Sequence, residues 1–390
     1  RDPSPCIVPV PTMAENEGQE SERSRRPQDT AFKQQRLRAW QPILTPKWVI
    51  SIFIGIGVLF IILGIILKSA SDQIVEYNIQ YAGDGTDEPY ATSCNIDTQN
   101  AGTTCNVTFS ITSDMEAPVY FYYRLTNFYQ NHRRYVKSLY WYQLQGKVLY
   151  DSDSEENCDP LVKNGTQYLN PCGLIANSLF NDAISLSTPG FSLRETGIAW
   201  PSDLDAKFAQ PEDFDYVELT AENCPDVSNC TCSEAFGSDA YGDDCGFYTE
   251  GNASYAYYYP EDDAVQYLYE TYPQVVNPIE GVTNEHFVVW MRTAALPTFR
   301  KLYGVIETDI PAGTELTFTV ENNFLVDSFD GTKGLVLSTT SWFGGRNPFL
   351  GIAYAAVGAC CVALGLAFFA KHRHSPRKLG DTRYLVWKEQ

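Results

Sequence analysis

The chain has 390 residues, a formal net charge of −20 at pH 7 and a sequence pI ≈ 4.6. The charge is segregated: residues 69–346 hold thirteen Lys and Arg against forty Asp and Glu, whereas basic residues outnumber acidic ones in both terminal segments. An acidic region of this size repels a phosphate backbone, so this composition excludes nucleic acid as a partner.

The N-terminal segment divides into two parts by composition. Residues 1–29 are rich in Pro, Glu, Ser and Arg, which predicts a disordered tail. Residues 30–47 interleave apolar and aromatic side chains with cations, and such a segment can lie among lipid headgroups or dock on the cytoplasmic face of a partner. The candidate partner contacts in this segment are Phe32, Arg36 and Trp40.

Residues 48–68 form the first long apolar stretch. Trp48 to Leu67 contains no charged residue, and as a helix it would span about 30 Å, which matches the hydrocarbon core of a bilayer. Thr45 can cap the helix, and Pro46 occupies a position where the missing N–H has no cost. We therefore predict a transmembrane helix that acts as an uncleaved signal anchor, in preference to a buried helix of a soluble domain.

Residues 69–346 show the period-two alternation of half-buried antiparallel strands. The first and last strands lie next to the two apolar stretches, so the ends of this region are expected to come together. Helices are expected only at 173–182 and 264–272. The predicted strands are 75–81, 107–111, 119–125, 286–294, 315–322 and 333–339.

Cysteines and glycosylation sequons also concentrate in residues 69–346, where an even number of cysteines indicates disulfides in an oxidising compartment. Eight cysteines allow 105 pairings, and short spacing favours Cys94–Cys105 and Cys158–Cys172. Four N-x-S/T sequons predict N-glycosylation. The cysteines are Cys94, Cys105, Cys158, Cys172, Cys224, Cys230, Cys232 and Cys245, and the sequon asparagines are Asn106, Asn164, Asn229 and Asn252.

Residues 347–370 form the second predicted transmembrane helix, followed by a basic tail at 371–390. Positive charge flanks the outer ends of both helices, which places both tails in the cytoplasm and residues 69–346 in the lumen or outside the cell. Neither Trp48–Leu67 nor Phe349–Ala370 contains an Asp, Glu, Lys, Arg or His residue, which argues against a transport pathway through this chain. Gly351, Ala355 and Ala359 recur at every fourth position, and this small-residue face can pack against the first helix or against a larger membrane partner.

Motifs for catalysis are not found. The sequence has no phosphate-binding glycine loop and no G-x-S-x-G motif, and nothing in it pairs His132 or His286 with a nucleophile. Cysteines in an oxidising compartment do not favour zinc. No catalytic, cofactor-binding or metal-binding residue is therefore predicted.

Five longer motifs carry a resemblance to a known family. They occupy residues 30–46, 121–138, 171–182, 286–304 and 344–351. With them, the chain from about Arg26 to Lys371 resembles the cell cycle control protein 50 family, also called ligand-effect modulators. These proteins are the non-catalytic β subunits of type-IV P-type ATPases, the lipid flippases.

The resemblance implies two transmembrane helices and a large antiparallel β-sandwich with long disulfide-linked loops. It also implies disulfides Cys94–Cys105 and Cys158–Cys172, while the four cysteines between Cys224 and Cys245 look like a fungal elaboration. The implied partner is a type-IV P-type ATPase in a heterodimer. The β subunit would escort this ATPase from the endoplasmic reticulum to the Golgi, endosomes or plasma membrane and support its activity. The ATPase would carry out all the chemistry and move aminophospholipids to the cytosolic leaflet.

A different class of protein fits composition and topology equally well. A stand-alone glycosylated surface receptor or adhesion protein would also combine two membrane helices with a disulfide-linked β domain. Export from the endoplasmic reticulum without any ATPase would distinguish this alternative from the flippase subunit.

Overall fold

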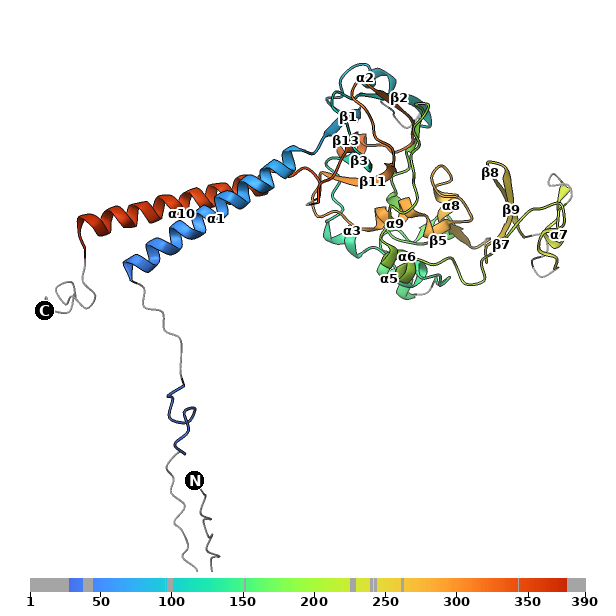
Figure 1. The fold of residues 1–390 in the computed structure, drawn as a ribbon. Coiled ribbons are helices and arrows are strands. Elements are labelled where there is room, and N and C mark those ends of the chain that lie inside the picture. Colours follow the sequence, from blue (N-terminus) through green and yellow to red (C-terminus); the bar gives the residue numbers. More distant parts are fainter. Residues whose placement is uncertain are drawn as a thin grey trace, which may run out of the picture. The chain divides into compact units, whose positions relative to one another are not determined.

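The computed structural model describes residues 28–37, 45–94, 96, 101–150, 152–224, 229–238, 241, 244–260, 263–342 and 344–376. It divides into two compact units, one of residues 1–56 with 361–390 and the other of residues 57–360. Figure 1 shows the helices and strands, with the two long helices α1 and α10 side by side.

Two helices of 27 residues each, α1 (Pro46–Asp72) and α10 (Pro348–His374), are long and apolar enough to cross a membrane. Both extend past the predicted stretches at their C-terminal ends. In α1 an ion pair stabilises the extra turn: the Nζ of Lys68 lies 2.6 Å from the carboxylate of Asp72, four residues further along the helix. In α10 the extra turn ends in basic residues, which a helix C-terminus favours.

The first sheet joins the two ends of the region between the helices. Its strands are β1 (Glu76–Gly83), β13 (Thr332–Ser338), β3 (Val119–Leu125) and β11 (Phe299–Ile306), in that order and all antiparallel. The first and last strands of the chain are direct neighbours, with Glu76 opposite Ser338. This pairing confirms that the ends of the region come together.

The second sheet faces the first and completes a β-sandwich. Its strands are β2 (Thr103–Ser110), β12 (Glu315–Asn322) and β6 (Ala183–Leu186), again antiparallel. Residues from both sheets form one core, in which the rings of Phe121 and Phe318 stack with centroids 4.2 Å apart. The alternation in the sequence marks the faces that enter this core.

Two three-stranded sheets, with short helices, lie in the long connections. The sheets are β10 (Val265–Tyr267), β5 (Gln167–Asn170) and β4 (Lys163–Asn164), and β7 (Asp215–Glu218), β9 (Ala253–Tyr258) and β8 (Gly246–Glu250). The helices are α2 (Tyr90–Ser93), α3 (Arg133–Lys137), α4 (Trp141–Leu144), α5 (Ser152–Cys158), α6 (Pro201–Lys207), α7 (Cys232–Phe236), α8 (Leu268–Thr271) and α9 (Glu285–Met291), with 3-10 turns η1 (Ala176–Ser178), η4 (Gly281–Thr283) and η5 (Asp327–Phe329).

Three secondary-structure predictions are wrong or incomplete. The predicted strand at 286–294 is largely helix α9, which Asn284 caps by accepting a hydrogen bond from the N–H of Phe287 at 3.1 Å. The predicted helix at 173–182 is reduced to the single turn η1, and 264–272 is divided between β10 and α8. Continuous apolar runs do not distinguish a buried helix from a buried strand, which explains the error at α9.

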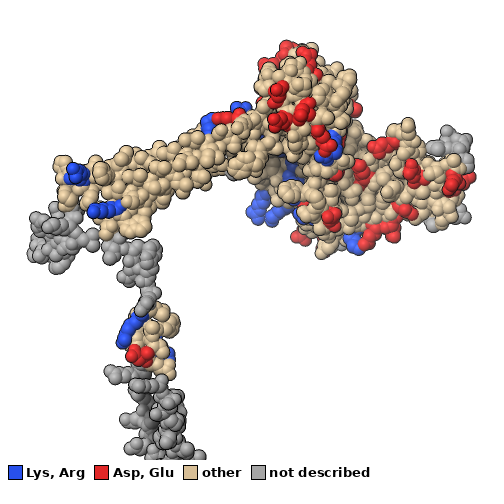
Figure 2. Space-filling view, in the orientation of Figure 1, with Lys and Arg blue, Asp and Glu red and all other residues tan. Residues whose placement is uncertain are grey.

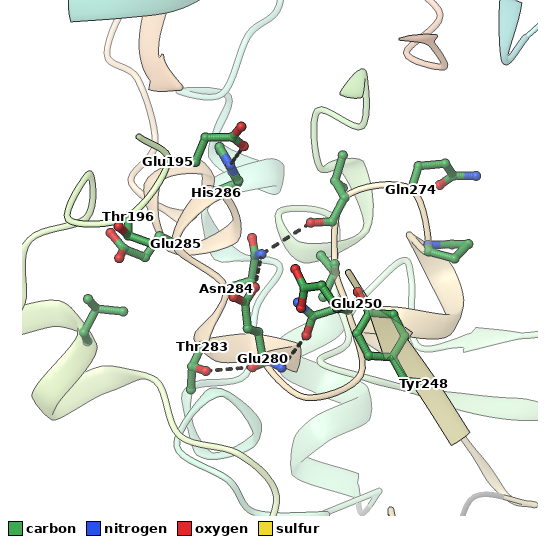
Figure 3. A pocket seen from close by; sticks show the side chains of 15 residues that line it. Glu195, Thr196, Tyr248, Glu250, Gln274, Glu280, Thr283, Asn284, Glu285 and His286 are labelled. Atoms are coloured by element: carbon green, nitrogen blue, oxygen red, sulfur yellow. Dashed lines mark hydrogen bonds and ion pairs between the residues drawn. The ribbon is translucent and has the colours of Figure 1, made fainter. Parts of the chain in front are cut away.

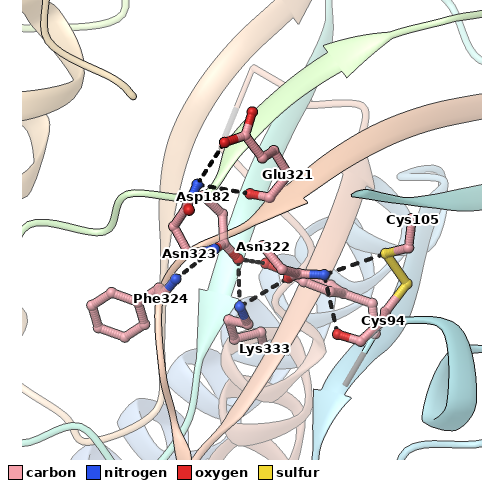
Figure 4. Close-up of polar contacts among 9 residues, drawn as sticks. Cys94, Cys105, Asp182, Glu321, Asn322, Asn323, Phe324 and Lys333 are labelled. Atoms are coloured by element: carbon pink, nitrogen blue, oxygen red, sulfur yellow. Dashed lines mark hydrogen bonds and ion pairs between the residues drawn. A yellow bond between two sulfur atoms is a disulfide. The ribbon is translucent and has the colours of Figure 1, made fainter. Parts of the chain in front are cut away.

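A buried polar cluster connects the two sheets (Figure 4). The Nζ of Lys333 donates to Asp182 at 2.6 Å and to the Oδ1 of Asn322 at 3.0 Å, and the hydroxyl of Tyr81 donates to the same Asp182 oxygen at 2.6 Å. Asn322 donates in turn to the carbonyl oxygen of Cys94 at 3.1 Å. Burial lowers the pKa of Lys333, and the Asp182 carboxylate opposes that shift. Strands β1, β13 and β12 therefore share one satisfied network.

Four disulfides link neighbouring parts of the β-rich region. Two of them are the pairs that the spacing favours, Cys94–Cys105 and Cys158–Cys172. The other two join Cys224 to Cys230 and Cys232 to Cys245, a pairing that the sequence left open. Both of these lie in the long connection that carries the β7–β9–β8 sheet.

Candidate partner-binding surfaces

The two membrane helices pack against each other through glycines. In the unit of residues 57–360, a Cβ added to Gly64 would lie 2.6 Å from the backbone nitrogen of Ala355, and one added to Gly358 would lie 2.7 Å from the carbonyl oxygen of Gly57. In the other unit, a Cβ on Gly365 would lie 2.8 Å from Ile54. The α10 glycines at 351, 358 and 365 are seven residues apart, the repeat that keeps one face of a helix against its neighbour.

This packing shows which residues of the predicted small-residue face contact α1 and which remain exposed. Gly351 is buried against Lys68 and Gly64 of α1, and Ala355 lies against Gly64, so both belong to the contact between the two helices. Ala359 is exposed in the described chain and is the member of the predicted set that a partner can reach. Gly55 of α1 also faces open space.

The predicted contacts in the N-terminal segment are only partly described. Residues 28–37 contain a turn in which Phe32 is 76% exposed and Arg36 lies 3.6 Å from Asp29. Trp40 lies outside the described residues. Both described side chains are accessible to a partner.

Three of the motifs that carry the family resemblance meet in the β-rich region. Residues 121–138 and 286–304 include the paired strands β3 and β11. Beyond the strands, the side chain of Gln130 accepts a hydrogen bond from the N–H of Ala294 at 2.8 Å. Asn131 donates to the carbonyl oxygen of the next residue, Ala295, also at 2.8 Å.

The third motif, residues 171–182, contacts both of the others. The indole N–H of Trp290 donates to the carbonyl oxygen of Ile175 at 2.8 Å, and the hydroxyls of Tyr135 and Ser178 are 2.8 Å apart. Trp290 is fully buried. The motifs are thus one packed structural element assembled from distant segments.

A surface that is both cationic and apolar covers this element. We call it the α3 surface and define it as Tyr129, Arg133, Val136, Lys137 and Leu296. All five are exposed, with Tyr129 at 54%, Val136 at 41% and Leu296 at 67%. Figure 2 shows Lys and Arg side chains gathered where Figure 1 labels α3, on a domain whose visible surface otherwise carries many acidic groups. Large exposed apolar groups beside arginine are typical of interaction surfaces.

A cavity of about 660 Å³ lies between the segment 273–286, the 195–196 loop and β8 (Figure 3). Two of its acidic side chains, Glu285 and Glu280, accept hydrogen bonds from neighbouring groups. Glu285 accepts hydrogen bonds from three successive N–H groups, those of residues 197–199, at 2.7 to 2.8 Å. Glu280 accepts one from the side chain of Asn284 at 2.6 Å.

His286 also lines this cavity. Its Nε2 lies 3.0 Å from a carboxylate oxygen of Glu195, and its ring lies 4.4 Å from that of Tyr303. Its Nδ1 is buried and, among the described residues, has no hydrogen-bond partner. Among the described residues, neither ring nitrogen of His286 is thus hydrogen-bonded to a hydroxyl or a thiol.

Lys301 links α9 to the first sheet. Its Nζ donates to the carbonyl oxygens of Val289, Trp290 and Arg292 at 2.9, 2.9 and 2.5 Å, at the C-terminal end of α9. Burial lowers the pKa of Lys301 to about 7, and the neighbouring Arg292 adds to this shift. Sequence reasoning missed Lys301 and the Asp182–Lys333 pair, since a single charged residue in an alternating strand gives no signal of burial.

The four sequon asparagines are all exposed: Asn106 on β2, Asn164 on β4, Asn229 beside Cys230, and Asn252 at the β8–β9 turn. None lies in the three motifs that meet beneath the α3 surface. Their accessibility is compatible with N-glycosylation.

Two membrane-spanning helices that flank, in the sequence, an antiparallel β-sandwich with four disulfides define a two-span membrane protein with a large extramembrane domain. The family model described as the LEM3 (ligand-effect modulator 3) family / CDC50 family matches residues 52–378, and the chain belongs to this family.

Relatives from plants, animals and yeast match the chain over most of its length. ALA-interacting subunit 3 of Arabidopsis thaliana is 40% identical over 370 residues, covering 93% of this chain and 91% of the relative. Cell cycle control protein 50A of Bos taurus is 38% identical over 371 residues, covering 90% and 91%. The phospholipid-transporting ATPase accessory subunit CRF1 of Saccharomyces cerevisiae is 32% identical over 405 residues, covering 94% and 90%.

Proposed function

We propose that the chain is the accessory β subunit of a phospholipid-transporting, type-IV P-type ATPase. The observation that carries this proposal is its similarity, over 94% of this chain, to a protein named as an accessory subunit of a phospholipid-transporting ATPase, together with its own membership of the LEM3/CDC50 family. In this role the chain forms a heterodimer with the ATPase and is needed for its folding, its export from the endoplasmic reticulum and its activity.

The chain is a non-catalytic subunit in this proposal. The ATPase supplies nucleotide hydrolysis and the lipid path, and it moves aminophospholipids to the cytosolic leaflet. Support comes from the chain's similarity to a protein named as an accessory subunit of a phospholipid-transporting ATPase.

The proposed topology places both tails in the cytoplasm and residues 69–346 in the lumen or outside the cell. Of the tail predicted at 1–29 and the pre-membrane segment predicted at 30–47, residues 1–27 and 38–44 lie outside the described residues. Basic residues at the end of α10 and the grouping of disulfides and exposed sequons between the helices support this orientation. The complex would travel from the endoplasmic reticulum to the Golgi, endosomes or plasma membrane.

In the membrane, Ala359 remains as the exposed candidate contact of α10, whereas Gly351 and Ala355 hold α1. Phe32, Arg36 and Trp40 are the proposed contacts on the cytoplasmic side. The partner would therefore be held at the cytoplasmic membrane surface as well as within the bilayer.

Affinity purification from mild detergent tests the proposal. The full-length chain, tagged and expressed with a candidate type-IV P-type ATPase, should recover that ATPase in equimolar amount, and the pair should hydrolyse ATP in response to phospholipid. When it is expressed alone, the chain should keep immature glycans typical of the endoplasmic reticulum. Export of the chain alone, with no ATPase recovered from any candidate pairing, would instead identify a stand-alone receptor or adhesion protein.

A further inference from the structure

We propose that a cationic cavity between α6, α9 and β11 binds the phosphate group of a phospholipid in the leaflet that faces the β-rich region. The cavity has a volume of about 310 Å³, and its lining includes Trp200, Arg292, Ala294, Arg300 and Lys301. We call it the α9 cavity. The proposed function places the lipid path in the ATPase, so this site on the present chain would be separate from that path.

The charge of the α9 cavity is opposite to that of the surrounding region. Residues 69–346 have forty acidic and thirteen basic residues, yet the lining of this cavity includes three of the thirteen basic residues and no Asp or Glu. Burial lowers the pKa of Lys301 to about 7, and the charge of Arg292 lowers it further. A bound anion would relieve this repulsion between cations.

The two arginines keep hydrogen-bond donors for a ligand. Among the described residues, each forms one ion pair: the Nε of Arg292 with Asp203 at 2.5 Å, and the Nη1 of Arg300 with Glu76 at 2.8 Å. A guanidinium carries five N–H donors, and its fork matches the oxygens of a phosphate group. The side chains of Arg292 and Arg300 are 52% and 34% exposed, so a ligand can reach both.

The other lining groups have different roles. The Nζ of Lys301 donates to three carbonyl oxygens at the end of α9, so this lysine would contribute charge rather than a hydrogen bond. Trp200 is 63% exposed, and its ring lies 5.3 Å from the guanidinium carbon of Arg292. An exposed aromatic ring beside the arginines would give the apolar glycerol part of a lipid a surface to pack on.

The position of Arg300 favours a lipid as the source of the phosphate. Its partner Glu76 follows the last residue of α1, Asp72, by four positions, and four extended residues span at most about 14 Å. On the other side, a Cβ added to Gly345, three residues before α10 begins, would lie 2.9 Å from the Nη2 of Arg300. Arg300 therefore lies close to the point where both helices leave the bilayer.

The segment that leads into α10 carries a second sign of the membrane surface. Trp342 is 79% exposed in a turn that is closed by backbone hydrogen bonds of 3.0 and 2.9 Å between Ser341 and Gly344. Tryptophan is enriched at the level of the lipid headgroups. A helix of 27 residues is about 40 Å long, which spans the hydrocarbon core and reaches into the headgroup layers. Headgroups are thus within reach of the α9 cavity.

Lipid binding to the purified full-length chain tests this inference. The chain in detergent is titrated with phosphatidylserine or with phosphatidylcholine, and native mass spectrometry counts the lipid bound to each chain. Phosphatidylserine should bind more tightly, because its headgroup has a net negative charge. Arg300→Gln should weaken its binding about tenfold, through loss of a charge-assisted contact.

A matched control and a second variant accompany this measurement. Arg194→Gln makes the same change at an arginine that pairs with Glu307 outside the cavity, and it should change the affinity by less than about twofold. Ala294→Leu keeps all three cations and fills part of the cavity, so it should weaken binding about threefold. Thermal unfolding reports whether each variant is folded. If Arg300→Gln lowers the melting temperature, Ala294→Leu decides.

Unchanged phosphatidylserine binding by the folded Arg300→Gln and Ala294→Leu chains would overturn this inference. Inorganic phosphate alone, at the concentration of the lipid, should displace little of it. Complete displacement would identify a site for a soluble anion and would also overturn the inference. Neither result affects recovery of the ATPase by the wild-type chain, which tests the proposed function separately.

Discussion

Gly64 of α1 and Gly351 of α10 lie against each other without space for a side chain on either. A Cβ on Gly64 would stand 2.8 Å from the carbonyl oxygen of Gly351, and a Cβ on Gly351 would stand 2.9 Å from the carbonyl oxygen of Gly64. Reciprocal backbone contact of this kind is how membrane helices gain packing energy when no hydrophobic effect drives them together. The glycines therefore belong to the subunit's own stability.

Gly64→Leu should separate α1 from α10, because the added side chain meets backbone atoms that cannot move aside. We expect a loss of about 1–3 kcal/mol, seen as a lower melting temperature of the detergent-solubilised chain. Gly55→Leu is the matched control, since a Cβ at Gly55 meets no atom within 4 Å. Equal melting temperatures for the two variants would contradict the observed packing.

Ala359→Leu separates partner binding from internal packing. This residue is exposed on α10, so the melting temperature of the chain alone should be unchanged. If the ATPase packs on this face, its recovery in mild detergent should fall. A Gly351→Leu variant cannot answer the question, because it also disrupts the contact with α1. Unchanged recovery of the ATPase with Ala359→Leu would remove this position from the proposed interface.

Lys333→Met should be strongly destabilising, because it leaves the Asp182 carboxylate buried without its cation. We expect a cost of about 3–5 kcal/mol in the free energy of unfolding. Lys333→Met combined with Asp182→Asn should recover part of this loss, since the uncompensated charge is then removed. The control Lys147→Met breaks an exposed ion pair with Glu212 and should cost about 0–1 kcal/mol. A small effect of Lys333→Met would mean that water reaches the cluster.

Lys301 should make stability depend on pH. Its pKa is about 7 in the folded chain and 10.5 for an exposed lysine, so between these values the unfolded chain binds more protons than the folded one. The free energy of unfolding should therefore rise with pH above 7 and level off near the unfolded pKa. Lys301→Met should flatten this dependence, as measured by denaturant unfolding at pH 7 and 9. A slope identical to that of the wild-type chain would contradict the assignment.

Cys94→Ser should destabilise the β-sandwich, because the Cys94–Cys105 disulfide closes a short loop whose backbone also accepts a hydrogen bond from Asn322. Loss of such a bond costs about 2–5 kcal/mol, and retention of the complex in the endoplasmic reticulum should follow. The matched control is Cys360→Ser, which changes an exposed free cysteine of α10. Normal glycan maturation of the Cys94→Ser chain would count against a structural role.

Changing each sequon asparagine to glutamine should remove one glycan apiece if residues 69–346 are lumenal. Each of Asn106, Asn164, Asn229 and Asn252 is exposed, so none of the four is shielded by the fold. The measurement is a stepwise gain in gel mobility, which endoglycosidase treatment should abolish for all variants. A chain without any glycan would contradict the proposed topology.

The sequence by itself determined the features that depend on local pattern and composition. The uncharged run from Trp48 to Leu67 can satisfy its backbone in a bilayer only as a helix, and alternation in 119–125 allows one buried face. These local patterns predicted the two membrane helices and the antiparallel strands, and the motifs carried the family resemblance. The same local view failed at α9, where a continuous apolar run carries no periodic signal.

Only the tertiary structure decided which residues meet. By their spacing alone, Gly351, Ala355 and Ala359 are equally good candidates for a partner contact. In the structure the first two pack against α1, and Ala359 is exposed. In the same way, three motifs that are distant in the sequence pack together beneath the α3 surface. Lys333 forms an ion pair with Asp182, which is 151 residues away in the chain. Such relationships arise from side-chain packing between segments far apart in the chain, and no local periodicity encodes them.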